Sequence, residues 1–142
     1  EVVRSLAAEF LEHLRTTEIT NKTPEEGLRH IAHNLLNQLL DERHLAFQRL
    51  IIAEARRFED LGKVWLESRP QQSRRVLAKF IHDLQQKKQL READPLLAAT
   101  LFHDMISFYP THKAMIEVPL TQDELNVFID EAVVVFMQGY GV

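Results

Sequence analysis

Apolar residues recur roughly every three to four positions along almost the whole chain, which is the spacing of amphipathic helices. One such stripe runs from Val2 to about Arg15, a polar loop covers Thr16 to Lys22, and a second stripe follows from Thr23 to Leu40. Within Phe47 to Leu66, the first half is apolar almost all round, a pattern typical of a helix buried on several sides. This stretch is expected to be the centre of the fold.

Helix-start signals divide the rest of the chain. Thr23 with Glu26, and Thr121 with Glu124, have the spacing of capping boxes, and prolines stand at expected first helical positions. Residues 110–120 form an expected connection, and Gly139 is an expected helix stop. No strand pattern appears, so the sequence predicts an all-α bundle of about seven helices, with the remaining ones near residues 42–58, 61–66, 70–88, 95–109 and 122–138.

Composition and charge narrow the class of protein. A chain of 142 residues is long enough for one domain with a sizeable core. It has no Cys, no signal-peptide pattern and no apolar run long enough to span a membrane, which favours a cytoplasmic protein. The net charge of −4 and the scattered basic residues indicate that the chain does not bind DNA by itself. It opens on Glu1 rather than Met, as expected of a fragment that lacks its N-terminal part.

Residues 52–67, IAEARRFEDLGKVWLE, resemble the signature of the C-terminal domain of TetR-type bacterial regulators in the AefR-like branch. There a run like IAEARRFPEL joins two helices, whereas this chain has Glu59 and Asp60 at the proline position. The resemblance implies that residues 1–142 are the ligand-binding and homodimerisation domain of a repressor, without its DNA-binding helix-turn-helix domain. Effector binding would then shift the helix from Val2 to Leu14 and change how the dimer meets DNA.

Glu54 is the least expected residue, because it lies on the apolar side of its helix with Phe47 and Ile51. It either anchors a ligand in an apolar pocket or is a structural carboxylate paired with an Arg or a helix N-terminus. The aromatic and Met residues are either plain core or the lining of a cavity for an apolar or amphipathic effector. The candidate ligand-binding residues are Phe47, Ile51, Glu54, Trp65, Phe80, Phe102 and Met105.

The last helix has a core face and, roughly opposite, two further valines, which suggests a second apolar contact outside the domain. The preceding helix has a polar side. Together the two helices are expected to pair with their symmetry copies in a four-helix bundle, as the resembled family does; the alternative is a deeper core without a dimer. The candidate interface residues are Thr100, His103, Ser107, Val127 and Val134.

No catalytic or metal motif is present. HExxH, Glu-x-x-His, GxSxG, GxGxxG and Walker patterns are all absent, so no enzyme activity and no cofactor is expected. His30 and His33 could join His44 or Asp41 at a metal, but solvated histidines explain them better. His103 and Asp104, like His82 and Asp83, diverge by about 100° on a helix and are not expected to form an acid–base dyad. A helical protein-interaction module without a small-molecule pocket remains the alternative function.

Overall fold

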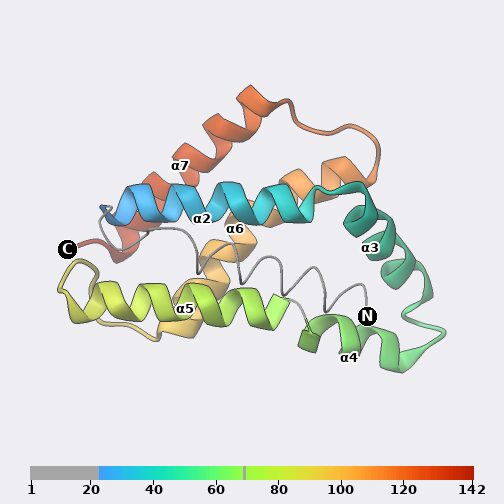
Figure 1. Cartoon of the computed structure of the whole chain (residues 1–142), viewed down its shortest axis with the longest axis horizontal. Coiled ribbons are helices and arrows are strands. Elements are labelled where there is room, and N and C mark those ends of the chain that lie inside the picture. The colour runs from blue at the N-terminus through green and yellow to red at the C-terminus, as the bar shows by residue number, and fades with distance from the viewer. Residues whose placement is uncertain (1–22, 69) are drawn as a thin grey trace.

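The computed structural model describes residues 23–68 and 70–142, and the fold of these residues is all-α (Figure 1). The helix expected from Val2 to about Arg15 and the loop from Thr16 to Lys22 lie outside the described residues. The predicted count of about seven helices is therefore not confirmed, although the fold class is. The described residues form six helices, α2 (Pro24–Leu39), α3 (Glu42–Glu54), α4 (Glu59–Ser68), α5 (Pro70–Gln86), α6 (Pro95–Met115) and α7 (Gln122–Tyr140).

The helix starts follow the sequence signals. At the start of α2 the Glu26 N–H donates to the Thr23 hydroxyl at 3.2 Å, and the Thr23 N–H donates back to the Glu26 carboxylate at 3.4 Å. Thr121 and Glu124 form the same reciprocal pair at the start of α7. Both capping boxes are confirmed, and each satisfies backbone donors that a helix start leaves unpaired. Two further helices, α3 and α6, begin at carboxylate caps supplied by Asp41 and Asp94.

Three helix ends differ from the prediction. Helix α3 ends at Glu54 rather than near Phe58. Helix α6 continues through Pro110 to Met115, where a connection was expected from residue 110. Helix α7 continues beyond Gly139 to Tyr140.

Pro110 lies inside α6 although a proline there removes one backbone hydrogen bond and crowds the preceding turn, at a cost of about 3 kcal/mol. The helix continues because Pro110, Thr111 and Ala114 are all buried, so that packing offsets this cost. The Thr111 hydroxyl also donates to the Ser107 carbonyl one turn earlier. The helix stops just before Glu117, whose φ of 66° lies in the left-handed region.

The last turn of α7 is held by its terminal aromatic residue. The Tyr140 ring stacks on Phe136 with centroids 4.7 Å apart, and the Arg91 guanidinium lies 4.3 Å from the Tyr140 ring centroid. These contacts extend the helix past the expected glycine stop. The next residue, Gly141, is the helix C-cap, and a Cβ there would lie 2.5 Å from the Met137 carbonyl oxygen. Only glycine fits that position without a shift of the backbone.

Helix α6 is the element around which the others pack, since it contacts α2, α3, α5 and α7. Its residues Ala98, Ala99, Phe102 and Ile106 are completely buried. The two alanines allow neighbouring helices to approach closely. Phe102 fills the space between helices and meets Phe136 of α7 edge to face, with ring centroids 5.1 Å apart.

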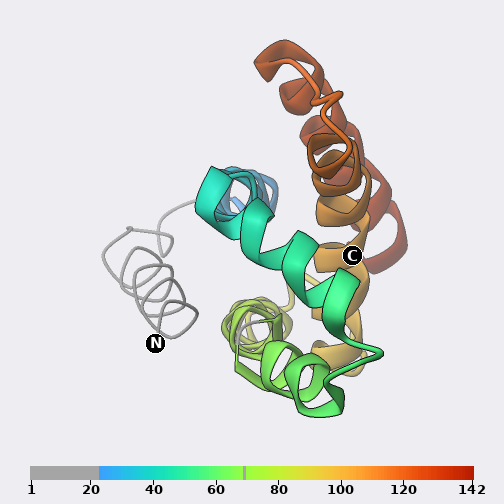
Figure 2. The same cartoon turned by 90° about the vertical axis from the view of Figure 1, so that its right-hand side faces the viewer.

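The helices form two layers with a corner at one end. Helices α2 and α5 run side by side, and α6 and α7 lie behind them as a second layer (Figures 1 and 2). Helices α3 and α4 sit at the end of this arrangement, at the right of Figure 1. The main core lies between the layers and includes Leu28, Ile31, Leu77, Ile81 and Ile129.

The stretch from Phe47 to Leu66 is therefore not the buried centre that its composition suggests. It forms most of α3, a turn and α4, at the corner of the domain. Leu50, Ile52 and Phe58 are each more than half exposed, and in the run 50–53 only Ile51 is buried. The reason is positional, because a helix at the end of two layers has neighbours on fewer sides than one between them.

Replacing Phe102 by Ala should lower the free energy of unfolding by about 3–5 kcal/mol, because the residual cavity lies at the junction of α6 and α7. The matched control is Phe58→Ala, which removes the same atoms from an exposed position and should change stability by about 0.5 kcal/mol or less. Urea denaturation followed by circular dichroism measures both. Equal losses in the free energy of unfolding for the two variants would contradict the placement of α6 at the centre of the domain.

Candidate functional site

Several polar side chains are buried inside the domain. His44 of α3 is 0% exposed, and Ser73 of α5 is also buried. On α6, His103, Ser107 and Thr111 are spaced four residues apart and are buried as well. These polar groups lie on three helices, of which α3 and α5 both pack against α6. Buried polar groups are costly in a plain core, so their gathering marks a candidate ligand site.

An aromatic contact joins α3 to α4 beside these polar groups. The His44 and Trp65 rings stack with centroids 5.1 Å apart and an interplanar angle of 15°. Phe47, one turn further along α3, meets Trp65 at 5.5 Å. Buried Ile51 follows on the same side of α3. The structure thus brings together Phe47 and Trp65 of the predicted ligand-binding set.

Two buried polar atoms in this region have no hydrogen-bond partner among residues 23–68 and 70–142. They are the Gln48 Oε1 atom on α3 and the Arg74 Nε atom on α5. A buried donor or acceptor left unpaired costs about 1–3 kcal/mol. One atom accepts and the other donates, so a polar molecule can satisfy either. Both atoms are therefore available to a molecule that carries hydrogen-bonding groups.

The other predicted ligand-binding residues lie elsewhere. Phe102 is fully buried in the main core, and Phe80 and Met105 pack against that core. Glu54 is the last residue of α3 and is partly exposed. Its carboxylate makes no hydrogen bond or ion pair with any described residue, so neither role proposed for it from the sequence is shown.

Sequence reasoning missed His44 and Gln48 as site residues. The signal was present, because positions 44, 48 and 51 follow one stripe of a helix. His44 was instead considered only as a possible metal ligand. Among the described residues, no group of three or more His, Cys, Asp or Glu is placed to hold a metal ion. His30 lies 3.0 Å from the Asn34 side-chain nitrogen.

His103 and Asp104 are in contact, although helix geometry predicted no acid–base dyad for this pair. The His103 Nδ1 atom lies 3.3 Å from a carboxylate oxygen of Asp104, and that same oxygen accepts a hydrogen bond from Arg74 at 2.8 Å. The 100° between neighbouring helix positions separates their Cβ atoms but not the ends of their side chains. Arg74 of α5 draws the carboxylate toward the α5–α6 contact, where His103 is buried.

The outward faces of α6 and α7 are rich in exposed apolar residues. Phe108 and Val127 are 71% and 70% exposed, and Val134 is 42% exposed. Leu97 and Leu101 continue the α6 face at helical spacing. Of the predicted interface residues, Thr100 is half-buried and donates to the Leu96 carbonyl, whereas His103 and Ser107 face the interior of the chain. Their place in a dimer stays a prediction.

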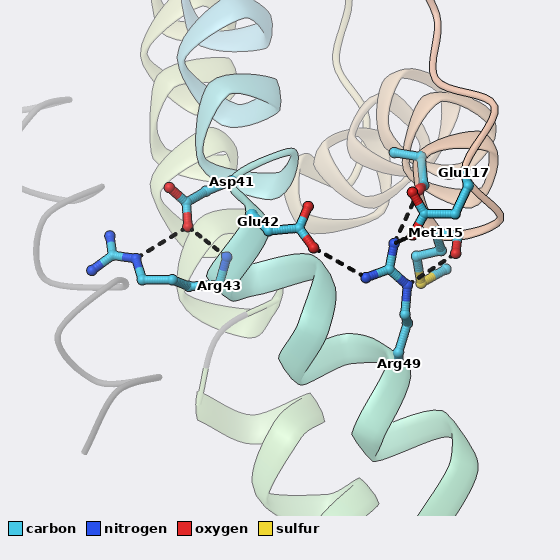
Figure 3. Close-up of polar contacts among 7 residues, drawn as sticks. Asp41, Glu42, Arg43, Arg49, Met115 and Glu117 are labelled. Atoms are coloured by element: carbon cyan, nitrogen blue, oxygen red, sulfur yellow. Dashed lines mark hydrogen bonds and ion pairs between the residues drawn. The ribbon is translucent and has the colours of Figure 1, made fainter.

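The Arg49 side chain links α3 to the end of α6 through hydrogen bonds and ion pairs (Figure 3). Its Nε atom donates to the Met115 carbonyl at 2.9 Å, and its Nη2 atom donates to the Ala114 carbonyl at 3.2 Å. The guanidinium also pairs with Glu42 at 3.3 Å and with Glu117 at 3.0 Å. Arg49 therefore provides a donor to the Met115 carbonyl and a further donor to the Ala114 carbonyl, which also accepts from the Glu117 N–H. Its charge complements the negative end of the helix dipole.

A family model described as the C-terminal domain of AefR-like transcriptional repressors matches residues 26–142. No curated protein is a significant match to the chain. None of the described helices is both long enough and apolar enough to cross a membrane.

Solved structures of TetR-family regulators share the fold. One from Mesorhizobium loti is 31% identical, with a TM-score of 0.87, over 99% of this chain and 72% of that one. One from Agrobacterium tumefaciens is 26% identical, with a TM-score of 0.74, over 96% and 71%. The flavonoid-responsive regulator FrrA is 22% identical, with a TM-score of 0.83, over 99% and 71%, which is a likeness of fold.

Replacing Arg49 by Ala should lower the free energy of unfolding by about 1–3 kcal/mol, because the Met115 carbonyl loses its side-chain donor and the contact between α3 and the end of α6 is lost. Arg43→Ala is the matched control, since Arg43 is 71% exposed and its ion pair is with Asp41 two residues away. Its effect should stay below about 1 kcal/mol. Thermal and urea unfolding measure both variants, and a control loss as large as that of Arg49→Ala would refute the role of Arg49 in linking the two helices.

Proposed function

Because the chain belongs to the TetR family of transcriptional regulators, with the AefR-like C-terminal domain over residues 26–142, we propose that it is the effector-sensing and dimerisation domain of its regulator. The domain is regulatory rather than enzymatic. DNA contact is assigned to a helix-turn-helix domain outside residues 1–142. Since such a regulator acts on DNA, we place it in the bacterial cytoplasm.

The observation that carries effector sensing is the polar interior between α3, α4, α5 and α6. A domain that needed only a stable core would be expected to fill this region with apolar side chains. Instead it contains a buried His44 stacked on Trp65, and Gln48 and Arg74 atoms without partners among the described residues. We propose an apolar or amphipathic effector whose polar groups bond these atoms and whose body packs on the Trp65 ring.

Dimerisation is supported by the exposed apolar faces of α6 and α7. Two such helices with their symmetry copies form a four-helix bundle through an isologous contact. Leu101, Phe108, Val127 and Val134 supply the apolar side chains that this contact buries. The same helix, α6, has the polar interior on its other side, so effector binding and subunit contact meet on one element.

The mechanism follows from this double role. An effector that packs more tightly when α3 and α4 take one position favours that position over others. Only this difference in affinity can shift the equilibrium between the conformations of the protein. The shift is then passed to the DNA-binding domains, whose separation in the dimer must match the operator half-sites. A change in that separation releases the DNA.

The dimer contact is tested by Leu101→Glu, which places a charge on the exposed face of α6. Native mass spectrometry should show the unsubstituted chain at twice its 16.6 kDa mass and the variant largely as a monomer. Ile52→Glu is the control, because Ile52 is similarly exposed but lies on α3. A monomeric parent chain, or a dimer unaffected by Leu101→Glu, would argue against this interface.

Effector binding is tested through Trp65, the single tryptophan of the chain, whose fluorescence reports on the proposed site. Screening hydroxylated aromatic compounds should yield one that quenches this fluorescence with saturation. Gln48→Leu should weaken its binding about tenfold, since the ligand loses a buried acceptor. The control Gln86→Leu changes an exposed glutamine on α5 and should leave binding unchanged. Equal affinities in all three proteins would exclude Gln48 from the site.

A further inference from the structure

A cavity lies at the junction where α2 passes into α3 and α6 passes into α7. It has a volume of about 300 Å³, and apolar side chains make up most of its walls. Those walls come from α3, α6 and α7, from the residue that follows α2 and from the α6–α7 connection, and none of the proposed effector-binding residues is among them. The apolar lining includes Leu40, Leu45, Pro110, Ala114, Leu120 and Leu125.

The only charged residues in the lining are two glutamates. Glu42 and Glu117 line the cavity and remain about 80% exposed, at 79% and 82%. Each uses its Oε1 atom to pair with the single guanidinium of Arg49, which is also engaged by two backbone carbonyls (Figure 3). Two carboxylates therefore share one positive charge, so this side of the cavity keeps a net negative charge.

The carboxyl end of α6 adds to this negative charge. Ala114, which lines the cavity, belongs to the last turn of α6, and the carboxyl end of a helix has a partial negative charge. An anionic ligand would be repelled by this end and by the glutamates. A neutral apolar ligand would fill the cavity but gain nothing from the carboxylate oxygens that Arg49 leaves unused. The negative charge at the rim and the apolar lining together favour a ligand that has a positive group on an apolar body.

We propose that this cavity is a binding site for a small amphipathic cation, separate from the effector site. The apolar part of the ligand packs between Leu45, Pro110 and Leu120. Its ammonium group lies at the rim, next to the carboxylates of Glu42 and Glu117. Because the lining comes from both layers of the domain, an occupied site holds the α2–α3 junction against the start of α7.

The probe is benzyltrimethylammonium, with phenylacetate as an anion of similar size. Each is titrated into the ¹⁵N-labelled chain, and amide shifts are followed by NMR. We expect saturable shifts at the cavity, including the amides of Leu45 and Leu120, with a dissociation constant of about 0.1–10 mM, in keeping with so small a ligand. Phenylacetate should bind at least about tenfold more weakly, and added salt should weaken the cation further.

The carboxylates are tested by the double variant Glu42→Gln and Glu117→Gln, with circular dichroism to check that it is folded. Its affinity for benzyltrimethylammonium should fall about tenfold, roughly the loss of one good ion pair at a partly enclosed site. The matched control is Glu131→Gln, an exposed glutamate of α7 that is not part of the lining, and its affinity should equal that of the parent chain.

Three results would overturn the proposal. The first is the absence of saturable shifts at the cavity amides up to about 50 mM cation, well above the expected range. The second is equal binding of phenylacetate, which would remove the charge preference. The third is unchanged affinity in a folded double variant. Loss of effector binding at Trp65 would affect none of these readouts, so the two sites can fail independently.

Discussion

Burial of one face of α6 is the interaction on which the rest of this domain depends. Ala98, Phe102 and Ile106 are buried where α6 meets its neighbouring helices, and α2, α5 and α7 are oriented by that contact. The opposite face keeps Leu101 and Phe108 exposed. A helix that is apolar on two faces fits two packing partners, one inside the chain and one outside it. In the proposed dimer, α6 would therefore connect the interior of the domain to the subunit contact.

The corner formed by α3 and α4 is held differently. His44 and Trp65 stack within the corner and join its two helices, whereas a few buried residues and Arg49 hold the corner to the rest of the chain. Leu50 and Ile52 remain exposed. Regions with fewer buried apolar contacts open at lower free energy than the core. The polar interior lies where this corner meets α6, which is the place where a ligand can alter the structure at the smallest cost.

The sequence was informative where the physics is local. Capping boxes at Thr23 and Thr121 were predicted because their hydrogen bonds span three residues. The course of α6 through Pro110 was not, because burial of distant side chains outweighs the local cost of proline. The exposure of Leu50 was missed for the same reason, since composition does not say how many neighbours a helix will have. Of the site, Phe47 and Trp65 were predicted from aromatic character, whereas the role of Gln48 depends on what α4 and α6 bring to it.

A core with partly unsatisfied polar atoms is less stable than an apolar one, since each such atom costs about 1–3 kcal/mol. Under the proposed function, this loss of stability serves ligand binding. A ligand that forms a hydrogen bond with Gln48 or Arg74 recovers that free energy only in one conformation. In that conformation the bonded residue and the Trp65 ring both face the ligand. The recovered free energy then adds to the stability of that one conformation and of no other, as linkage requires. An apolar interior of the same shape would be more stable without ligand, and for that reason less able to respond to one.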